Sequence, residues 1–514
     1  DLTDEQRAAV THGEGPLLIL AGAGSGKTRV ITRRVAYLLR QGVKPWNILA
    51  ITFANKAAGE MRARVEALAP GTRVWVSTFH SLGARLLRQY ADRLNIDKNF
   101  TVYDTDDRNK LIREAIAACG FEEKFTPERL SGVISKAKNQ LLTPPMFEKT
   151  ANDFFSRVAA QVYPAYEKRL RAANGMDFDD LLYLPAMALI RNEEFRKDLD
   201  ARFKYVLIDE YQDTNLAQYE VAKRLSKDHP NLCVVGDPDQ SIYKWRGSDI
   251  KNILDFERDY PAARVITLDR NYRSTKGILH AASTLIARNT QRKKKGLITD
   301  NPSGEPVRII TFDNGLDEVE GAVVRIKKAV EAGKFKYRDH AIFLRINALS
   351  RTLESAFVKH GVPFQIVKGL AFYDRKENKD VLAYLRLLVN PQDSVSFLRA
   401  VNEPGRGIGK VSLDRLSAYA EKMEIGLFAA AGQVAMIPEI KGKAATGLRD
   451  FFQLVTELRA KLDQPPHELI ETVLQKSGYR KMLAASKDED DVDRLANVEE
   501  VITAARQFYE ADPD

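Results

Sequence analysis

The chain has 514 residues, 44% of them hydrophobic and 29% charged, and 79 Lys and Arg against 70 Asp and Glu give a net charge of +9. The length predicts about three to four domains, and the composition excludes a disordered or fibrous chain. Cys119 and Cys233 form no metal-binding pattern, which argues against a disulfide framework or zinc site and favours the reducing cytoplasm. No apolar run reaches about 18 residues, so we expect no membrane span. The positive charge favours a polyanionic partner.

The first chemical signal is a glycine-rich loop between a predicted strand and a predicted helix. LLIL at 17–20 leads into AGAGSGKT at 21–28 and then into an amphipathic segment at 27–41. Such a loop lets backbone N–H groups converge on phosphate oxygens at the helix N-terminus. The expected phosphate-binding residues are Gly22, Ala23, Gly24, Ser25 and Gly26. Lys27 is expected to reach the β and γ phosphates of ATP, and Thr28 to bind Mg²⁺.

Two acidic residues follow a second apolar segment, in FKYVLIDEYQDTN. At the end of a buried strand, Asp209 suits the Mg²⁺ shell and Glu210 suits a general base that polarises the attacking water. Paired acids after a strand can also be helix caps or solvated groups. Their occurrence together with the phosphate loop favours the catalytic interpretation.

A third apolar segment ends in a polar loop, in NLCVVGDPDQSIYKWRGSD at 231–249. Gln240 is expected to orient water near the γ phosphate. Tyr243 and Trp245 can stack on unpaired bases or pack in a core. Because Gln240 and Arg246 share this short loop with both aromatic residues, we expect loss of the γ phosphate to move the aromatic side chains.

Motifs along residues 2 to 274 resemble, in order and spacing, those of UvrD/PcrA/Rep-type superfamily 1 DNA helicases. They are LTDEQRAAV, AGAGSGKT, ITFANKAAGEMRARV, STFHSLGARLLR, DFDDLL, VLIDEYQDTN, VVGDPDQSIYKWRGSD and LDRNYRS. They do not distinguish UvrD from PcrA or Rep. The resemblance implies an α/β fold with two RecA-like parallel-sheet motor domains and two inserted, mainly helical subdomains. It also implies that ATP and Mg²⁺ drive 3′ to 5′ movement along single-stranded DNA and the parting of 3′-tailed duplex DNA, in repair or replication.

The resemblance assigns further residues to the nucleotide site. Gln6 is similar to the adenine reader, a role that suits an amide because it both donates and accepts hydrogen bonds. Tyr272 is similar to the tyrosine that stacks on the base, and Arg273 to the arginine that touches the γ phosphate from the second motor domain. Arg29 and Arg246 are also expected near the nucleotide.

The resemblance assigns DNA contacts as well. The expected single-strand contacts are Phe53, Asn55, Thr78, Phe79 and His80, with Tyr243 and Trp245 as the stacking platform. Phe178 and Asp180 resemble a further motif near the DNA path, although a helix cap with a core phenylalanine explains them equally. Gly407 and Gly409 form the turn of a predicted helix–hairpin–helix that could bind a duplex phosphate, or the turn of an ordinary helical hairpin.

The alternation of apolar segments predicts the domain limits. We expect motor domain 1A at 1–98 and 181–274, helical insertion 1B at 99–180, the first part of motor domain 2A at 275–371, and helical insertion 2B at 372–514. Domain 2A is expected to contain strands at 307–313, 340–346 and 363–369. We expect insertion 1B to contain no strand.

The chain contains neither the HAAKGLEF-like nor the RLxYVxxTRA-like motif of the family. We therefore expect a fragment with an incomplete second sheet. The chain is expected to be cytoplasmic, and repair or replication proteins are its candidate partners; the sequence does not set its oligomeric state, for which a monomer or weak dimer is the expectation. The last of the two missing motifs supplies a second arginine to the γ phosphate, and such an arginine contributes about 10³ to 10⁵ in turnover. With Arg273 alone, the chain should bind ATP but hydrolyse it poorly. The competing hypotheses are a nucleotide-gated module that binds single strands or recruits partners without unwinding, and a helicase–nuclease subunit, for which we find no nuclease-like acidic cluster.

Overall fold

The structure is a computed structural model, and it describes residues 2–122, 124–290, 292–293, 296–344, 349–366, 372–485 and 489–511. The chain divides into two compact units. One is Asp1–Gly304 together with Glu377–Asp514, and the other is Glu305–Lys376. In the described residues, no helix combines the length and the apolar character that a membrane crossing needs.

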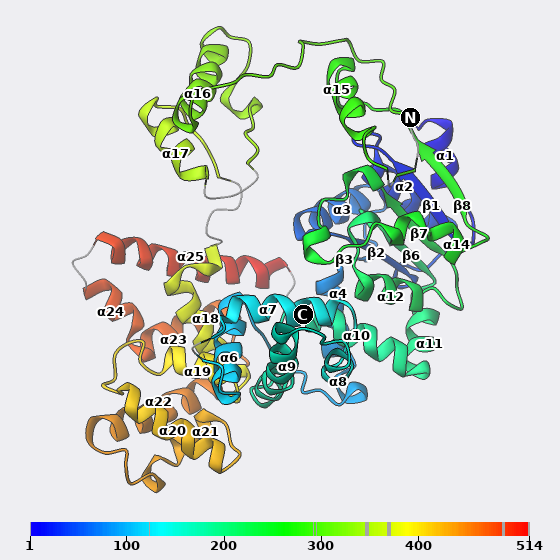
Figure 1. Ribbon diagram of the computed structural model, residues 1–514. Helices are drawn as coiled ribbons and strands as arrows, with labels where there is room; N and C mark the ends of the chain where they lie inside the picture. Colours follow the sequence, from blue (N-terminus) through cyan, green and yellow to red (C-terminus); the bar gives the residue numbers. More distant parts are fainter. Residues whose placement is uncertain are drawn as a thin grey trace. The chain divides into compact units, whose positions relative to one another are not determined.

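Part of the larger unit is built on a six-stranded sheet with helices around it (Figure 1), in the strand order β3-β2-β6-β7-β1-β8. Its strands are β1 (Leu17–Ala21), β2 (Ile48–Thr52), β3 (Trp75–Thr78), β6 (Tyr205–Ile208), β7 (Leu232–Gly236) and β8 (Arg264–Leu268). Every neighbouring pair in it is parallel, as expected for a RecA-like domain. The carboxyl ends of parallel strands meet at one edge, so this topology brings together the loops that follow β1, β6 and β7.

Alternate strand residues pack into two cores, one on each face of the sheet. Leu17 and Ile19 lie in the core that helices α2 and α3 cover, whereas Leu18 and Leu20 lie in the core under α4, α10 and α12. These helices are α2 (Lys27–Arg40), α3 (Asn55–Leu68), α4 (Phe79–Gln89), α10 (Asp180–Arg191) and α12 (Leu216–Arg224). Burial on both faces explains why the strands read as continuous apolar runs.

Further helices complete this part of the unit. They are α1 (Asp4–Val10), α5 (Ala91–Leu94), α11 (Glu193–Arg202), α13 (Lys251–Leu254), α14 (Phe256–Asp259) and α15 (Lys276–Ile286). Helices α4 and α10 approach closely at Gly83, where an added Cβ atom would lie 1.7 Å from the carbonyl oxygen of Leu181. Only glycine fits such a contact.

Residues 99–180 are mainly helical, and their core also includes Val395 from the later helical region. The helices are α6 (Thr105–Ala118), α7 (Pro127–Asn139), α8 (Pro144–Glu148) and α9 (Phe154–Ala172). The expectation that no strand occurs here is wrong, because β4 (Thr101–Val102) pairs in parallel with β5 (Gly175–Met176). Two-residue strands are too short to produce an apolar run that sequence reading can detect.

The chain from Lys376 onward is helical in its described residues. The helices are α18 (Lys376–Val389), α19 (Ser394–Ala400), α20 (Lys410–Lys422), α21 (Leu427–Gly432), α22 (Gly442–Arg459), α23 (Pro466–Ser477), α24 (Tyr479–Ala485) and α25 (Glu489–Ala511). Buried polar contacts join this region to residues 99–180. The Tyr103 hydroxyl donates to Asp393 at 2.7 Å, and Asn390 Nδ2 donates to Thr101 Oγ1 at 3.0 Å.

The smaller unit, Glu305–Lys376, contains α16 (Gly315–Glu331) and α17 (Ser350–Lys359), which pack around Val323, Ala356 and Val362. Residues 275–304 are part of the larger unit, and Ile298 forms a parallel bridge with Arg270 just after β8.

The three strands expected in the second motor domain are not formed in their described residues. Residues 345–346 and 367–369 of these segments lie outside the described residues. A strand needs a neighbour to satisfy its backbone hydrogen bonds, and no such pairing occurs within the described part of the smaller unit. Ile309 and Phe343 accordingly remain 97% and 93% exposed.

Candidate active site and nucleic-acid interface

The glycine-rich loop has the geometry of a phosphate cradle. Strand β1 ends at Ala21 and helix α2 begins at Lys27. Gly24 and Gly26 between them have φ of +68° and +92°, values that favour glycine. Gly26 is the N-cap of α2 and provides no capping side chain, so the first N–H groups of the helix face the loop. A helix N-terminus of this kind attracts an anion.

Four predicted catalytic and metal-binding residues come together at the ends of β1 and β6. Lys27 Nζ lies 2.8 Å from Glu210 Oε2. The Thr28 hydroxyl bonds to Asp209, which is 6% exposed. Glu210 has φ of +54°, a left-handed conformation that turns the chain sharply after the strand. Residues 183 positions apart in the sequence therefore form one compact site.

The electrostatics of the Asp209–Glu210 pair favour the binding of a cation. Burial, and then the neighbouring charge of Glu210, raise the pKa of Asp209 from 3.8 to about 7, while Lys27 opposes the shift. A carboxyl that keeps a proton near neutral pH is one that a bound cation would stabilise in its charged form. The hydroxyl of Thr28 and the carboxylate of Asp209 are oxygen ligands of the type that Mg²⁺ prefers. The donor set therefore fits Mg²⁺.

Gln240 connects to Glu210 through two residues that the sequence analysis missed. Gln240 Nε2 donates to Asp237 Oδ2 at 2.6 Å. The Asp237 N–H donates to Gln212 Oε1 at 2.9 Å, and Gln212 Nε2 donates to Glu210 Oε2 at 2.9 Å. Gln212 and Asp237 are both buried, and both closely follow a strand. Polar residues at strand ends were the signal that could have identified them.

The predicted adenine reader, Gln6, lies against the phosphate loop. It is 2% exposed, and its Nε2 donates to the carbonyl of Ser25 at 3.0 Å. Its helix is held by Arg34, also 2% exposed, which donates to the carbonyls of Ala9, Val10, His12 and Gly13. Sequence reasoning missed Arg34 because its partners lie on another helix and the loop after it.

The segment after β8 also lies against the loop. Asn271 Nδ2 donates to the carbonyl of Ala23 at 2.6 Å, and the Tyr272 N–H donates to the carbonyl of Gly24 at 3.0 Å. An added Cβ atom at Gly24 would lie 2.7 Å from Arg273 Cβ. The predicted residues Tyr272 and Arg273 therefore adjoin the cradle, held by Asn271, which sequence reasoning missed although it belongs to the same NYRS string.

The two remaining predicted arginines differ in what the structure describes. Arg29 is exposed in the first turn of α2, one turn from the phosphate loop. Arg246 closes a short 3₁₀ turn, Lys244–Arg246. Its side chain lies outside the described part of the chain, so its contact with the nucleotide stays a prediction.

Two aromatic pairs lie among the loops at the carboxyl edge of the sheet. Phe53 stacks on Tyr243 with ring centroids 4.7 Å apart and an interplanar angle of 28°. Trp245 lies beside Tyr243, with centroids 6.5 Å apart, and is 66% exposed. His80 stacks on Phe178 at 4.0 Å, and Phe178 is 54% exposed. The core alternative is therefore wrong for Trp245 and Phe178.

Two of the DNA contacts predicted on β3 and α4 have buried side chains. Phe79 is 5% exposed and packs in the core with Leu82 and Leu86, because the first residue of α4 faces the sheet. Its ring is not available to DNA in this structure. Thr78 is also buried, and its hydroxyl caps α4 by accepting from Ser81 N at 3.2 Å. Asn55 is exposed, and the Thr78 hydroxyl donates to its Oδ1 at 3.5 Å.

The predicted helix–hairpin–helix turn joins α19 to α20. Gly407 has φ of +74°, Gly409 is the N-cap of α20, and both are exposed. Ile408 between them is 3% exposed and anchors the turn. The geometry leaves both alternatives open, a phosphate-binding turn or an ordinary helical hairpin.

Comparison with known proteins identifies the family. The UvrD/REP helicase N-terminal domain matches residues 2–261, and the UvrD-like helicase C-terminal domain matches residues 266–513. The ATP-dependent DNA helicase PcrA of Bacillus subtilis (strain 168) is 45% identical over 518 residues, which cover 100% of this chain and 70% of the relative. The PcrA proteins of Staphylococcus epidermidis (strain ATCC 12228) and Staphylococcus aureus (strain NCTC 8325) are 45% and 44% identical, over 100% of this chain and 71% and 70% of theirs. These matches confirm the resemblance read from the motifs, and the chain belongs to the UvrD/REP helicase family.

Proposed function

We propose that the chain couples ATP hydrolysis to 3′ to 5′ movement along single-stranded DNA and to the parting of 3′-tailed duplex DNA, in repair or replication. As a member of the UvrD/REP helicase family, it is an ATP-dependent DNA helicase, the activity for which its PcrA relatives are named. The observation that supports the proposal is that the nucleotide site and the exposed aromatic side chain lie at the same edge of the sheet. The Lys27–Glu210 pair and the exposed Trp245 belong to loops at the same edge of one sheet.

The nucleotide site divides the chemistry among its residues. Lys27 and the N–H groups of the glycine-rich loop would bind the phosphates, and Gln6 would read the adenine. Thr28 and Asp209 would hold Mg²⁺, which would neutralise charge on the β and γ phosphates. Glu210 would accept the proton of the attacking water, and its hydrogen bond from Gln212 fixes the carboxylate for this task.

The loop after β7 would pass the state of the nucleotide to DNA. Gln240 begins this connection, through Asp237 and Gln212 to Glu210. Three residues later Tyr243 stacks on Phe53. Loss of the γ phosphate would shift this loop and release or engage a stacked base.

We also propose that the chain is organised as motor domains 1A and 2A with insertions 1B and 2B.

The Lys27→Ala variant tests hydrolysis. We expect DNA-stimulated ATP turnover in the unmodified chain and a loss of about 10²-fold or more in the variant, because a charged partner of the phosphates is removed. Turnover is measured with and without single-stranded DNA. The matched control is Lys227→Ala, which removes a lysine that is 50% exposed. Tight DNA binding with negligible turnover in the unmodified chain would instead support a nucleotide-gated binding module.

The Trp245→Ala variant tests the DNA surface. We expect it to weaken single-stranded DNA binding by about 1 to 3 kcal/mol, the contribution of stacking on one base. The dissociation constant is measured by fluorescence anisotropy with a labelled oligonucleotide. Trp46→Ala is the control, because Trp46 is 61% exposed but precedes β2, at the amino edge of the sheet. Equal affinity losses in both variants would contradict the proposed surface.

A further inference from the structure

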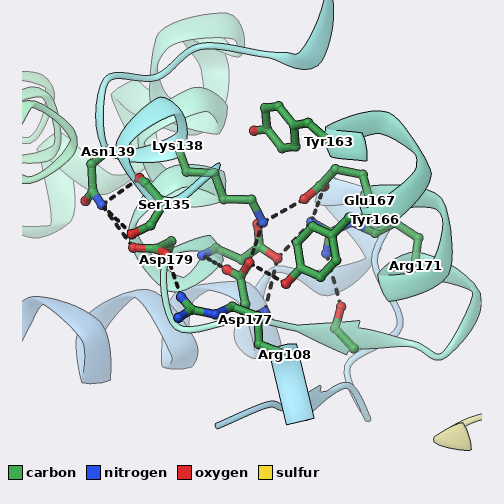
Figure 2. A network of polar contacts seen from close by, with 12 residues as sticks. Arg108, Ser135, Lys138, Asn139, Tyr163, Tyr166, Glu167, Arg171, Asp177 and Asp179 are labelled. Atoms are coloured by element: carbon green, nitrogen blue, oxygen red, sulfur yellow. Dashed lines mark hydrogen bonds and ion pairs between the residues drawn. The ribbon is translucent and has the colours of Figure 1, made fainter. Parts of the chain in front are cut away.

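A buried ion network fixes the carboxyl end of helix α7. Lys138 is fully buried and points into a group of three carboxylates (Figure 2). Its Nζ lies 2.7 Å from Glu167, 2.7 Å from Asp177 and 2.9 Å from Asp180. Removing Lys138 would leave the buried carboxylate of Asp177 without the cation it pairs with, so the network tolerates little displacement.

The network also fixes a turn that carries one of the aromatic pairs. The Asp180 N–H donates to Asp177 Oδ1 at 2.8 Å, and the Asp177 N–H donates to Asp180 Oδ2 at 3.2 Å. Between them Phe178 projects outward and stacks on His80. Burial, and then the charge of Asp177, raise the pKa of Asp180 to about 7, while Lys138 opposes the shift. The end of α7 and the Phe178 turn are therefore one packed assembly.

The next residue of α7 reaches a different partner. Asn139 Nδ2 donates to Asp179 Oδ1 at 2.9 Å, and Asn139 Oδ1 accepts from Asn215 Nδ2 at 2.5 Å. Asn215 Oδ1 is already used, because it accepts from Gln218 N at 2.9 Å and caps α12. The Asn215 amide therefore joins α12 to α7, and Asn139 passes this connection to the Phe178 turn.

Asn215 stands where two functional segments meet. The 3₁₀ turn Tyr211–Asp213, directly after Asp209 and Glu210, leads to it through Thr214. The Thr214 carbonyl accepts from Asp249 N and from Asn252 Nδ2, both at 3.0 Å, which ties down the segment that follows Trp245. A displacement of the acidic pair would reach position 215 over five residues of buried chain.

We propose that Asn139 is a positioning residue, and that its hydrogen bond with Asn215 links the nucleotide site to the stacked Phe178–His80 pair, which we place on the DNA-binding surface. Through this bond, a change at Glu210 moves α7 together with the Phe178–His80 pair, and DNA bound there biases the nucleotide site in return. The inference rests on the proposed function, since it needs both ligands. Energetic coupling between two sites is reciprocal, so it can be measured from the DNA side without turnover.

The test is a double-mutant cycle on the full chain. Asn139→Ala removes the acceptor, and Asn215→Asp removes the amide donor but keeps an oxygen that caps α12. The readout is the ratio of dissociation constants for single-stranded DNA without and with a non-hydrolysable ATP analogue. The control, Asn47→Ala, removes the hydrogen bond from Asn47 Nδ2 to the Arg202 carbonyl, at 2.7 Å, at the amino edge of the sheet. Melting temperatures show that each variant is folded.

In the unmodified chain we expect the ratio of the two dissociation constants to differ from one. Each variant should shift this ratio toward one by a factor of about three to ten, which is the effect of a single hydrogen bond. The double variant should change the ratio no more than either single variant, because both break the same bond. Affinity for DNA without nucleotide should stay within about twofold, and Asn47→Ala should keep the unmodified ratio. A ratio of one in the unmodified chain, unchanged ratios in both variants, or effects that multiply in the double variant would overturn the inference. DNA-stimulated hydrolysis is measured separately, so its absence would count against the proposed function instead.

Discussion

Asp209 and Glu210 are adjacent in the sequence, but their carboxylates differ in burial and in partners. Asp209 is 6% exposed and bonds to Thr28, whereas the Glu210 side chain is 32% exposed and pairs with Lys27. The left-handed backbone at Glu210 separates the two side chains. Environments that differ in this way assign different tasks to chemically similar groups. A metal ligand and a general base can thus stand side by side.

The raised pKa of Asp209 predicts a pH-dependent effect of Asp209→Asn on stability. Between pH 3.8 and about 7 the folded protein keeps a proton that the unfolded chain has lost, so the contribution of Asp209 to the free energy of unfolding falls as the pH rises through this range. Asparagine avoids this cost. We expect the variant to be more stable by about 1 to 4 kcal/mol at pH 8, and the gain to vanish near pH 4, in denaturant unfolding without Mg²⁺.

The control for this experiment is Asp198→Asn. Its side chain is 54% exposed and pairs with Arg93, so we expect no comparable gain at pH 8. Equal stability of the Asp209→Asn and unmodified proteins at pH 8 would show that the carboxyl is not destabilised by burial. The same variant should lose Mg²⁺-dependent hydrolysis, which would separate stability from activity at this position.

Among the elements, α1 and α2 form a unit around the nucleotide loop. Helix α1 is seven residues long, too short to be stable by itself. Its last carbonyls carry partial negative charge, and the guanidinium of Arg34 on α2 lies against them. Lys27 begins the same helix α2. The two helices therefore place Gln6 and Lys27 on one frame.

Arg34→Met should loosen this frame. We expect a loss of about 2 to 5 kcal/mol in the free energy of unfolding, because several buried carbonyls lose a charged donor. We also expect a higher KM for ATP with a smaller change in kcat, since Gln6 would be less well placed. Thermal unfolding and steady-state kinetics measure the two effects. Arg33→Met, a partly exposed neighbour on the same helix, is the control, and an equal rise of KM there would contradict the role of Arg34.

Across the whole molecule, the sequence was most informative where chemistry depends on short spacing. The loop around Lys27 and the pair at Asp209 follow strands directly, so their motifs predicted both their structure and their proximity. Asn139 and Asn215 are 76 positions apart, and no local pattern shows that they meet. The buried position of Phe79 was not predicted, because a motif gives the residue type but not the direction of its side chain. The helical spacing of Phe79, Leu82 and Leu86 was a signal of its burial.

The predicted second sheet shows what a local apolar pattern does not determine, which is whether a strand finds a partner to pair with. Apolar runs such as 307–313 indicate a capacity to form strands, but a strand exists only when another segment pairs with it. The apolar side chains of Ile309 and Phe343 are exposed rather than buried between layers. Pairing depends on distant segments, and the period of one segment cannot specify it.

The small core of unit Glu305–Lys376 predicts uneven stability across the molecule. In its described residues, the buried cluster consists of Val323, Ala356 and Val362, whereas the sheet of the larger unit is covered on both faces. We expect the amides of α16 and α17 to exchange with solvent about 10²-fold or more faster than those of β1 and β7, relative to their intrinsic rates. Hydrogen exchange with mass spectrometry measures this difference. Equal protection of the two units would contradict the prediction.

The close approach of α4 and α10 at Gly83 has a mechanical consequence. At this contact the backbone of Gly83 lies against the carbonyl of Leu181 with no side chain between them, so the two close-packed helices have little room to shift against each other. His80 belongs to α4, and Phe178 stands two residues before the start of α10. The rings of His80 and Phe178 are therefore held at fixed positions relative to the two helices, so a movement of this helix pair would displace the stacked rings without separating them.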